Sequence, residues 1–440
     1  MTRIFAGFSK VKITPPLGTP LGGNVRDKGA EEVHDDLFAK TIVLSDGKKE
    51  VALTSCALIG IPGKMVDRIR KTAENLCKIP GENIQVIAFH THSGPETGVI
   101  FEEVNEKYLD GLPQLIAQGI CKAKENLEKM DLYVGRGKEP TLCNNRRIWM
   151  KDGTLRMNWE KLNLEDIREP AGPVDSEVGL IVAKGEDGAP RGIFINYSCH
   201  PAILAGDNFL ISEDYPGYTT RFIESKTGAL SIFSNGATGN INHINVFNPE
   251  QRRGFYEAKR LGTILGKKVI SSVDKASPLS FDKINLHQKR IELPLRFISP
   301  QEAKWAKSLV AGKPIEKISL VDGISDQIYA KQILTLSKIK EKILTTEVDV
   351  LSLGDKLALV SIPGELFVEF GLKIKKQSSF PYTYIIGYAN DYVGYIPTKK
   401  AFEEGGYEVR TGAASKLAPE AGEIILKEIL SLLKEAYAGE

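Results

Sequence analysis

Apolar residues along the chain follow two patterns, alternation at every second position and recurrence every three to four positions, which predict strands and helices respectively. Alternating or β-branched runs bounded by turn residues predict strands at residues 5–13, 37–44, 50–58, 84–89, 132–135, 178–183, 192–197, 230–233, 284–295, 348–353, 357–362 and 384–388. Helical spacing predicts helices that begin at Pro62 and that cover residues 104–127, 254–269, 300–311, 326–343 and 419–437. The mixture predicts an α/β (α+β) fold in which mixed β-sheets carry flanking helices.

The pattern changes character after residue 275. Residues 276–345 combine strand-like pieces with two Lys/Glu-rich helical segments. We therefore expect one main domain made of residues 1–275 and 346–440, with 276–345 as an inserted or peripheral subdomain that contributes little chemistry. No internal sequence repeat is evident.

Several predicted strands end in a side chain that can bind a metal ion. His90 and His92 mark the end of the run 84–89, His200 follows the run 192–197, and Glu365 follows the last hairpin. Because side chains on a strand repeat every second residue, His90 and His92 are expected to leave the sheet on one face and to converge. A lone histidine in such a place most simply caps a sheet, but the paired spacing and its recurrence at His200 favour a metal site.

Two glycine-bearing loops are candidates for substrate contact. Gly22 and Gly23 permit close approach of the backbone to a ligand, although a plain turn is the commoner use of such a pair. The turn N-G-A-T-G-N-I-N at residues 235–242 can present backbone N–H groups and a hydroxyl to a substrate oxygen. It lacks the lysine of a phosphate-binding loop, which argues against a nucleotide.

The composition limits the classes of molecule that the chain is expected to bind. The chain has 440 residues, with 58 basic and 56 acidic side chains, so its charge points neither to nucleic acid nor to an anionic membrane, and we expect a small-molecule substrate. Its apolar runs are too short for a transmembrane segment, and its first residues lack the apolar core of a secretory signal. Five scattered cysteines without a C-x-x-C pair predict reduced thiols and a cytoplasmic protein. A homo-oligomer is compatible with all of this.

Five short motifs occur in a fixed order between Gly7 and Glu408. They read H-T-H-S-G-P, Y-S-C-H-P, N-G-A-T-G-N-I-N, I-P-G-E, and D-Y-V-G-Y-I-P-T followed by G-G-Y-E. Together they resemble the N-terminal catalytic domain of the zinc-dependent neutral ceramidases. The resemblance covers nearly the whole chain, and five motifs in register are far more specific than one.

The resemblance implies a Zn²⁺ ion bound by four side chains, which would be His90, His200, Glu365 and Tyr395. Two nitrogen and two oxygen donors suit zinc, and a tyrosinate among them is an unusual and therefore discriminating ligand. His92 would then stand beside the metal as an acid, a base or an oxyanion partner.

The resemblance also implies roles for residues around the metal. Arg146 matches the active-site arginine of the family, and Tyr407 matches its second active-site tyrosine. Gly23 lies near the family's substrate-contacting glycine, and Asn240 belongs to the turn that would contact the substrate.

The chain departs from the family at one candidate catalytic position. Thr238 followed by Gly239 stands where neutral ceramidases have a serine followed by proline. Threonine keeps a hydroxyl, but we favour a zinc-bound water over Thr238 as the attacking group. The chain is also expected to lack the secretory signal and the C-terminal β-sandwich of those enzymes, which points to a substrate that is smaller and more polar than a membrane lipid.

These observations predict a zinc-dependent hydrolase that attacks a carbonyl compound with metal-activated water. The bond broken is an amide by resemblance, and the alternative is a ring or carbon–carbon bond beside a ketone in a small polyhydroxylated substrate. A TIM-barrel metal amidohydrolase also uses a strand-end H-x-H, although the hairpin at residues 37–58 argues against that topology. A non-catalytic zinc protein is the third alternative, and it predicts a closed ligand shell without a pocket.

Overall fold

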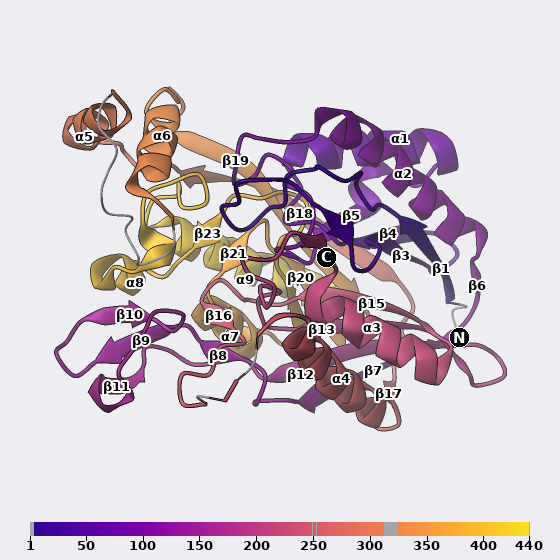
Figure 1. Ribbon diagram of the computed structural model, residues 1–440. Coiled ribbons are helices and arrows are strands. Elements are labelled where there is room, and N and C mark those ends of the chain that lie inside the picture. The colour runs from indigo at the N-terminus through magenta and orange to yellow at the C-terminus, as the bar shows by residue number, and fades with distance from the viewer. Residues whose placement is uncertain (1–3, 249, 252, 312–323, 440) are drawn as a thin grey trace.

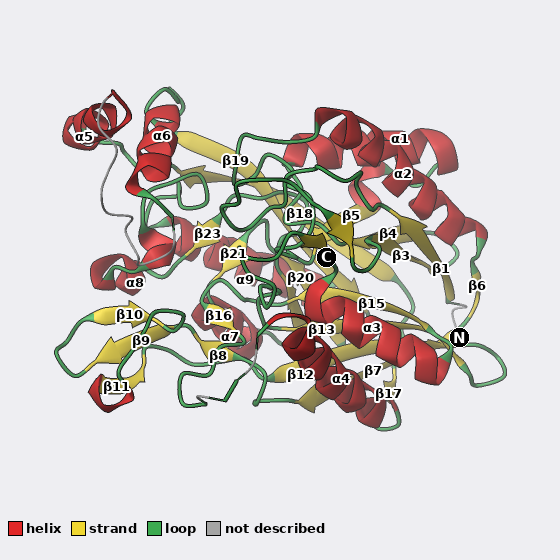
Figure 2. Cartoon of the chain, in the orientation of Figure 1, coloured by secondary structure: helices red, strands yellow, loops and turns green. Residues whose placement is uncertain are grey.

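The computed structural model describes residues 4–248, 250–251, 253–311 and 324–439 (Figure 1). It confirms the mixed α/β class, with strands in the interior and most helices at the periphery (Figure 2). Within these ranges, no helix has both the length and the apolar character that a membrane crossing requires.

The first sheet is formed by the N-terminal part of the chain, in the strand order β5-β4-β3-β1-β6. Its strands are β1 (Phe5–Lys12), β3 (Phe38–Ser45), β4 (Glu50–Cys56), β5 (Ile84–Ala88) and β6 (Glu128–Lys129). β4 and β5 run parallel, whereas β1, β3 and β4 pair antiparallel. Helices α1 (Gly63–Cys77) and α2 (Glu106–Glu125) pack against this sheet because their buried apolar stripes join its core.

The second sheet has the strand order β15-β13-β12-β7-β17. Its strands are β7 (Asp131–Lys138), β12 (Glu177–Lys184), β13 (Pro190–Tyr197), β15 (Leu230–Asn235) and β17 (Ser277–Pro278). Helices α3 (Asp214–Thr227) and α4 (Gly254–Val273) cover it. They approach closely because α4 carries glycine at the contact: a Cβ on Gly262 would lie 2.5 Å from the Cβ of Tyr218.

The third sheet joins distant parts of the chain in the order β18-β19-β20-β22. Its strands are β18 (Ile284–Pro294), β19 (Ile343–Leu353), β20 (Leu357–Ser361) and β22 (Tyr382–Ile386), and the helices beside it are α7 (Val368–Gln377) and α9 (Ala421–Ala438). β18 pairs with β19 along its whole length, from Ile284 opposite Leu353 to Pro294 opposite Ile343.

Residues 276–345, which the sequence sets apart as a subdomain, contribute to this third sheet. Helix α5 (Pro300–Ala311) has the predicted bounds, but α6 (Asp326–Leu336) ends before the predicted residue 343. The longer helix was wrong because Ile343 already begins β19, where pairing with β18 outweighs the helical propensity of the segment. The division into a main domain, residues 1–275 with 346–440, and a subdomain, residues 276–345, stays a prediction. Strand β18 lies inside residues 276–345.

Small ribbons complete the structure around the ends of the large sheets. One is three-stranded, in the order β10-β9-β11, and the others are the pairs β2/β14, β8/β16 and β21/β23. Their bounds are β2 (Glu32–Val33), β8 (Asn144–Asn145), β9 (Arg147–Met150), β10 (Leu155–Met157), β11 (Ile167–Pro170), β14 (Leu210–Ile211), β16 (Ile241–Asn242), β21 (Glu365–Leu366) and β23 (Tyr395–Ile396), and the short helix α8 covers Lys399–Glu404.

Each large sheet contains one parallel pair, and the carboxyl ends of these pairs meet. The pairs are β4/β5, β13/β15 and β20/β22. Backbone bonds join the ends: Ala88 N donates to Tyr388 O at 3.1 Å, and Gly387 N donates to Asn235 O at 3.0 Å. The described strands thus form separate sheets of at most five strands, which excludes the eight-stranded TIM barrel.

Candidate metal centre and active site

His90 follows the end of β5 in an unusual backbone conformation. The strand stops at Ala88, so the expectation that His90 and His92 share a strand face was wrong. His90 instead has φ of +68°, in the left-handed region, which costs energy for any residue that has a Cβ. Its backbone N–H donates to Leu58 O at 2.9 Å, which holds this turn in place. The two rings still face each other, with centroids 5.0 Å apart.

Backbone carbonyls orient His90 and His200. Nδ1 of His90 donates to the carbonyl oxygen of Ile59, and Nδ1 of His200 donates to Thr238 O at 3.2 Å. Because a carbonyl can only accept, each Nδ1 carries the proton and each Nε2 keeps its lone pair. Both Nε2 atoms lie 3.7 Å from Oε2 of Glu365. This is the arrangement by which proteins orient metal-binding imidazoles.

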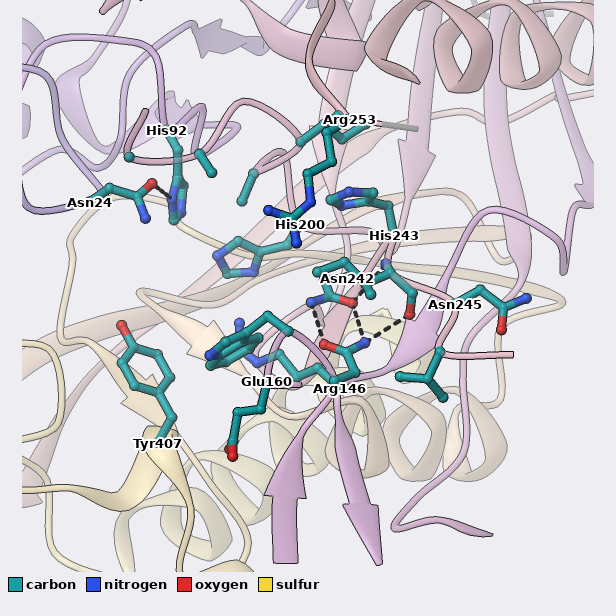
Figure 3. A pocket seen from close by; sticks show the side chains of 18 of the residues that line it. Asn24, His92, Arg146, Glu160, His200, Asn242, His243, Asn245, Arg253 and Tyr407 are labelled. Atoms are coloured by element: carbon teal, nitrogen blue, oxygen red, sulfur yellow. Dashed lines mark hydrogen bonds between the residues drawn. The ribbon is translucent and has the colours of Figure 1, made fainter. Parts of the chain in front are cut away.

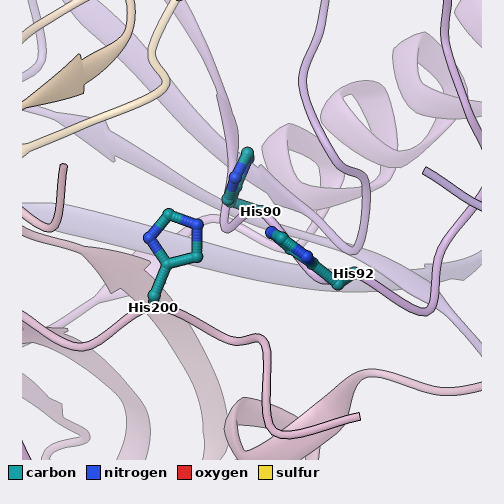
Figure 4. A group of neighbouring side chains, drawn as sticks. All are labelled: His90, His92 and His200. Atoms are coloured by element: carbon teal, nitrogen blue, oxygen red, sulfur yellow. The ribbon is translucent and has the colours of Figure 1, made fainter. Parts of the chain in front are cut away.

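The buried atoms at this point lack protein partners. Oε2 of Glu365 and the Nε2 atoms of His92 and His200 are buried without a hydrogen bond among the described residues. The ligand nitrogens of His90, His92 and His200 all lie within 4.8 Å of one another (Figure 4). A divalent cation would satisfy these atoms together, so the residues present fit a metal ion.

Burial also sets the protonation of this cluster. Removal from water lowers the pKa of His90 to about 3 and the pKa of His200 well below its ordinary value. Burial raises the pKa of the Glu365 carboxyl to about 7. Neutral imidazoles are the form that a metal binds, so the electrostatics agree with the geometry.

Tyr395 is placed beside Glu365 by the short ribbon β21/β23. The two strands are parallel, and Glu365 and Tyr395 are register partners in it. Tyr392 also contacts Glu365, because its hydroxyl donates to Oε1 at 2.5 Å. Oε1 is therefore held in place while Oε2 faces the histidines.

Arg146 lies between β8 and β9, and its side chain approaches the cluster from there. Its Nε donates to Oε1 of Glu408 at 2.8 Å, and the other carboxylate oxygen accepts from Arg147 at the same distance. Within the described part of the chain Nη2 of Arg146 is buried without a hydrogen-bond partner, and the guanidinium stands 5.2 Å from the ring centre of Tyr395. Sequence reasoning missed Glu408 as a site residue, although it follows Tyr407 within the quoted G-G-Y-E motif.

A cavity of about 680 Å³ opens beside the cluster (Figure 3). Six of the sequence-predicted site residues line it: Gly23, His92, Arg146, His200, Tyr395 and Tyr407. Nδ1 of His92 donates to Oδ1 of Asn24 at 3.0 Å, a partner that sequence reasoning also missed. The sequence marks Asn24 only by its position next to Gly23.

Gly23 is fitted against the ring of His92. It has φ of +82°, and a Cβ there would lie 2.4 Å from Cγ of His92. The ring can reach its position only because this residue has no side chain.

Thr238 and Asn240 lie behind the site rather than in the cavity wall. Both are fully buried, and neither belongs to the cavity lining. The Thr238 hydroxyl shares a 2.7 Å hydrogen bond with that of Tyr388. The Asn240 amide donates to Glu369 at 2.9 Å, and its oxygen accepts from Val368 N at 2.9 Å. The structure thus places them where they support the turn that carries His200's partner carbonyl.

Comparisons with known proteins show which sequences and folds this chain is similar to. No family model matches the chain. Neutral ceramidase 1 of Arabidopsis thaliana is 24% identical over 234 residues, which are 50% of this chain and 28% of the plant protein. The crystal structure of neutral ceramidase from Pseudomonas aeruginosa superposes with a TM-score of 0.76 at 18% identity, and covers 100% of this chain and 75% of that one.

A second solved structure, a ceramidase complexed with C2, gives the same TM-score of 0.76 at 16% identity. The match covers 100% of this chain and 76% of the ceramidase chain. The chain therefore has the fold of the neutral ceramidases along its whole length, and its sequence is similar to one of them over half of that length.

Proposed function

We propose that this chain, which has the neutral-ceramidase fold, is a zinc-dependent hydrolase that cleaves an amide bond. One observation carries the proposal. The Nε2 atoms of His90 and His200 converge on Oε2 of Glu365 at 3.7 Å, buried beside an open cavity. A purely structural zinc site is closed, so the cavity favours catalysis over the non-catalytic alternative.

His90, His200, Glu365 and Tyr395 are the proposed ligands. Their two nitrogen and two oxygen donors suit zinc among the common divalent ions. When bound, zinc would polarise a substrate carbonyl and acidify a water molecule. The Nε2 atom of His92 faces the same point, which makes His92 either a proton acceptor there or a replacement for Tyr395 in the ligand set.

The remaining residues act on the substrate. Nη2 of Arg146 is buried without a hydrogen-bond partner among the described residues and would donate to the carbonyl oxygen as negative charge develops on it. His92 would take the proton of the attacking water, since Asn24 fixes its ring. Tyr407, whose ring centre lies 5.6 Å from that of Tyr395, would orient the substrate from the cavity wall.

Thr238 does not fit a nucleophile. Its hydroxyl is bonded to Tyr388 and is fully buried outside the cavity lining. This supports water as the attacking group.

The cavity wall is mixed, and its polar part supports a polar substrate. The amide side chains of Asn158, Asn242, Asn245 and Gln251 stand in it beside a larger number of apolar residues, among them Trp159, Leu162 and Ile244. The same amide groups also support a second candidate reaction, because amides bind hydroxyl groups well. This reaction is the cleavage of a ring or carbon–carbon bond beside a ketone in a polyhydroxylated compound. A cytoplasmic location completes the proposal, supported by five cysteines that are all free thiols.

A substrate screen tests the function. Purified protein would be incubated with short N-acyl amides and, in parallel, with cyclic keto-polyols, and carboxylate release would be measured. We expect release from the amides in wild type and none in a His200→Ala variant of equal fold by circular dichroism. Release from the keto-polyols alone would replace the amide reaction by the second candidate, and release from neither would overturn both.

A further inference from the structure

The cavity carries a positive charge that the proposed hydrolysis does not use. Arg253, the residue before α4, lines the cavity, and Figure 3 shows its side chain pointing inward toward His243. Among the described residues, no carboxylate lies within ion-pair distance of it. The other charged groups of the wall are neutralised: Arg146 by Glu408, and Glu160 by Arg156.

His243 presents a second donor at the same place. It lines the cavity, only 6% of its surface is exposed, and its Nδ1 is buried without a partner among the described residues. An imidazole nitrogen beside a guanidinium is a combination that binds anions, because both can donate and one is always charged.

Hydrogen bonds of Gln251 fix the backbone at His243. The Gln251 side chain donates to His243 O at 2.9 Å and to Oε1 of Glu257 at 3.0 Å, and it accepts from Asn245 N at 2.9 Å. Gln251 therefore ties His243 and Asn245 to the first turn of α4. The α4 N-terminus adds a partial positive charge near Arg253.

We propose that Arg253 and His243 form a subsite for an anionic group of the substrate. The substrate would be a small amide that carries a carboxylate or a phosphate-like group within the same cavity. The inference rests on the proposed function, which supplies the amide, but the subsite itself concerns binding.

A binding experiment tests the subsite independently of turnover. In 4-oxononanoate a ketone replaces the amide of N-hexanoylglycine, so the compound cannot be hydrolysed, and nonan-4-one, in which a methyl group replaces the carboxylate, is its neutral counterpart. Calorimetric titration of the metal-loaded protein should show about tenfold tighter binding of the acid. In Arg253→Gln this preference should disappear, whereas Arg253→Lys should keep part of it. The control Arg168→Gln, an exposed arginine of β11 outside the cavity, should keep all of it.

The outcomes separate the two proposals. Equal affinity for the acid and for nonan-4-one, binding of neither, or a preference that survives Arg253→Gln would overturn the subsite. A preference lost in Arg253→Gln, without any amide hydrolysis, would leave the subsite standing and overturn the proposed function. A phosphonate analogue, 3-oxooctylphosphonate, distinguishes the source of the anion: tighter binding than the carboxylate indicates a phosphorylated substrate.

Discussion

Arg146 and Glu408 form a fully buried ion pair beside the histidine cluster, with Nε and Oε1 2.8 Å apart. The exposed fractions of the two side chains are 4% and 0%. Glu408 also pairs with Arg147, whose guanidinium has a second carboxylate partner in Glu404. The position of Arg146 in the cavity wall depends on this carboxylate.

We expect Glu408→Ala to destabilise the protein by about 3–5 kcal/mol, because removing one member of a buried pair leaves the other charge uncompensated. Urea unfolding monitored by circular dichroism measures this change. The control Glu169→Ala removes a partner of the exposed Arg168 and should leave the unfolding midpoint unchanged. Equal midpoints for both variants would contradict the role given to Glu408.

The sequence predicts the fold well where the local pattern and the final pairing agree. The strand 357–362 and the helix 300–311 appear at β20 and α5 with nearly the same bounds. The helix 326–343 is too long because its last residues pair with β18, a contact that local periodicity does not contain. The parallel pairs are likewise invisible to pattern alone, since their partners meet only in the folded chain.

The site could be predicted as residue types but not as geometry. The strand-end placements identify His90, His200 and Glu365 as metal-binding candidates, and the structure brings them together. The left-handed backbone of His90 has no sequence signal, because a histidine gives no sign of φ. Glu408 was missed as a partner of Arg146 because 262 residues separate the two.

Substitution tests which side chains hold the proposed metal ion. We expect about one zinc per chain in the wild type. A double variant, His200→Ala with Glu365→Ala, should lose it, because each of these residues supplies a buried ligand atom and the two atoms lie 3.7 Å apart. Tyr395→Phe should weaken zinc retention during dialysis against a chelator, and His92→Gln should not. Metal content by atomic absorption decides this. Zinc lost from His92→Gln but kept in Tyr395→Phe would exchange the two roles, and zinc retained by the double variant would refute the site.

Thr238→Ala tests the attacking group. We expect turnover within a few-fold of wild type and a loss of about 1 kcal/mol of stability, since only the hydrogen bond to Tyr388 is removed. Steady-state kinetics and urea unfolding measure the two effects. Complete loss of turnover with zinc retained would make Thr238 a nucleophile.

Glu96 should make stability depend on pH. It is buried on the loop after β5, and its Oε1 accepts backbone N–H bonds from Gly98 and Val99, each at 2.9 Å, while Oε2 has no partner among the described residues. Burial raises the pKa of Glu96 from 4.5 to about 7, which outweighs these bonds. Between these pH values the native state holds a proton that the unfolded state has lost. The free energy of unfolding therefore falls as pH rises from 4.5 to 7 and levels off above it.

Glu96→Gln removes this titration while keeping the oxygen that accepts the backbone bonds. Relative to wild type, the variant should gain on the order of 3 kcal/mol of stability between pH 4 and pH 8. Urea unfolding across that range measures the gain, with the exposed Glu103→Gln as the control that should show none. Parallel pH profiles for wild type and Glu96→Gln would show that Glu96 is ionised in the native state.

Gly23 and Gly18 offer a matched pair for testing how His92 is positioned. Both have φ of +82°, so alanine at either position carries the same backbone strain, about 1 kcal/mol. Their surroundings differ: a Cβ on Gly23 would lie 2.4 Å from Cγ of His92, whereas a Cβ on Gly18 would meet nothing within 4 Å.

Gly23→Ala should therefore displace the His92 ring, and we expect kcat/KM to fall on the order of 10- to 100-fold with zinc content unchanged. Gly18→Ala should lose a similar amount of stability without this loss of activity. Amide hydrolysis and metal content measured on both variants separate strain from displacement. If the two variants lose activity equally, backbone strain alone explains the effect, and the contact between Gly23 and His92 has no part in catalysis.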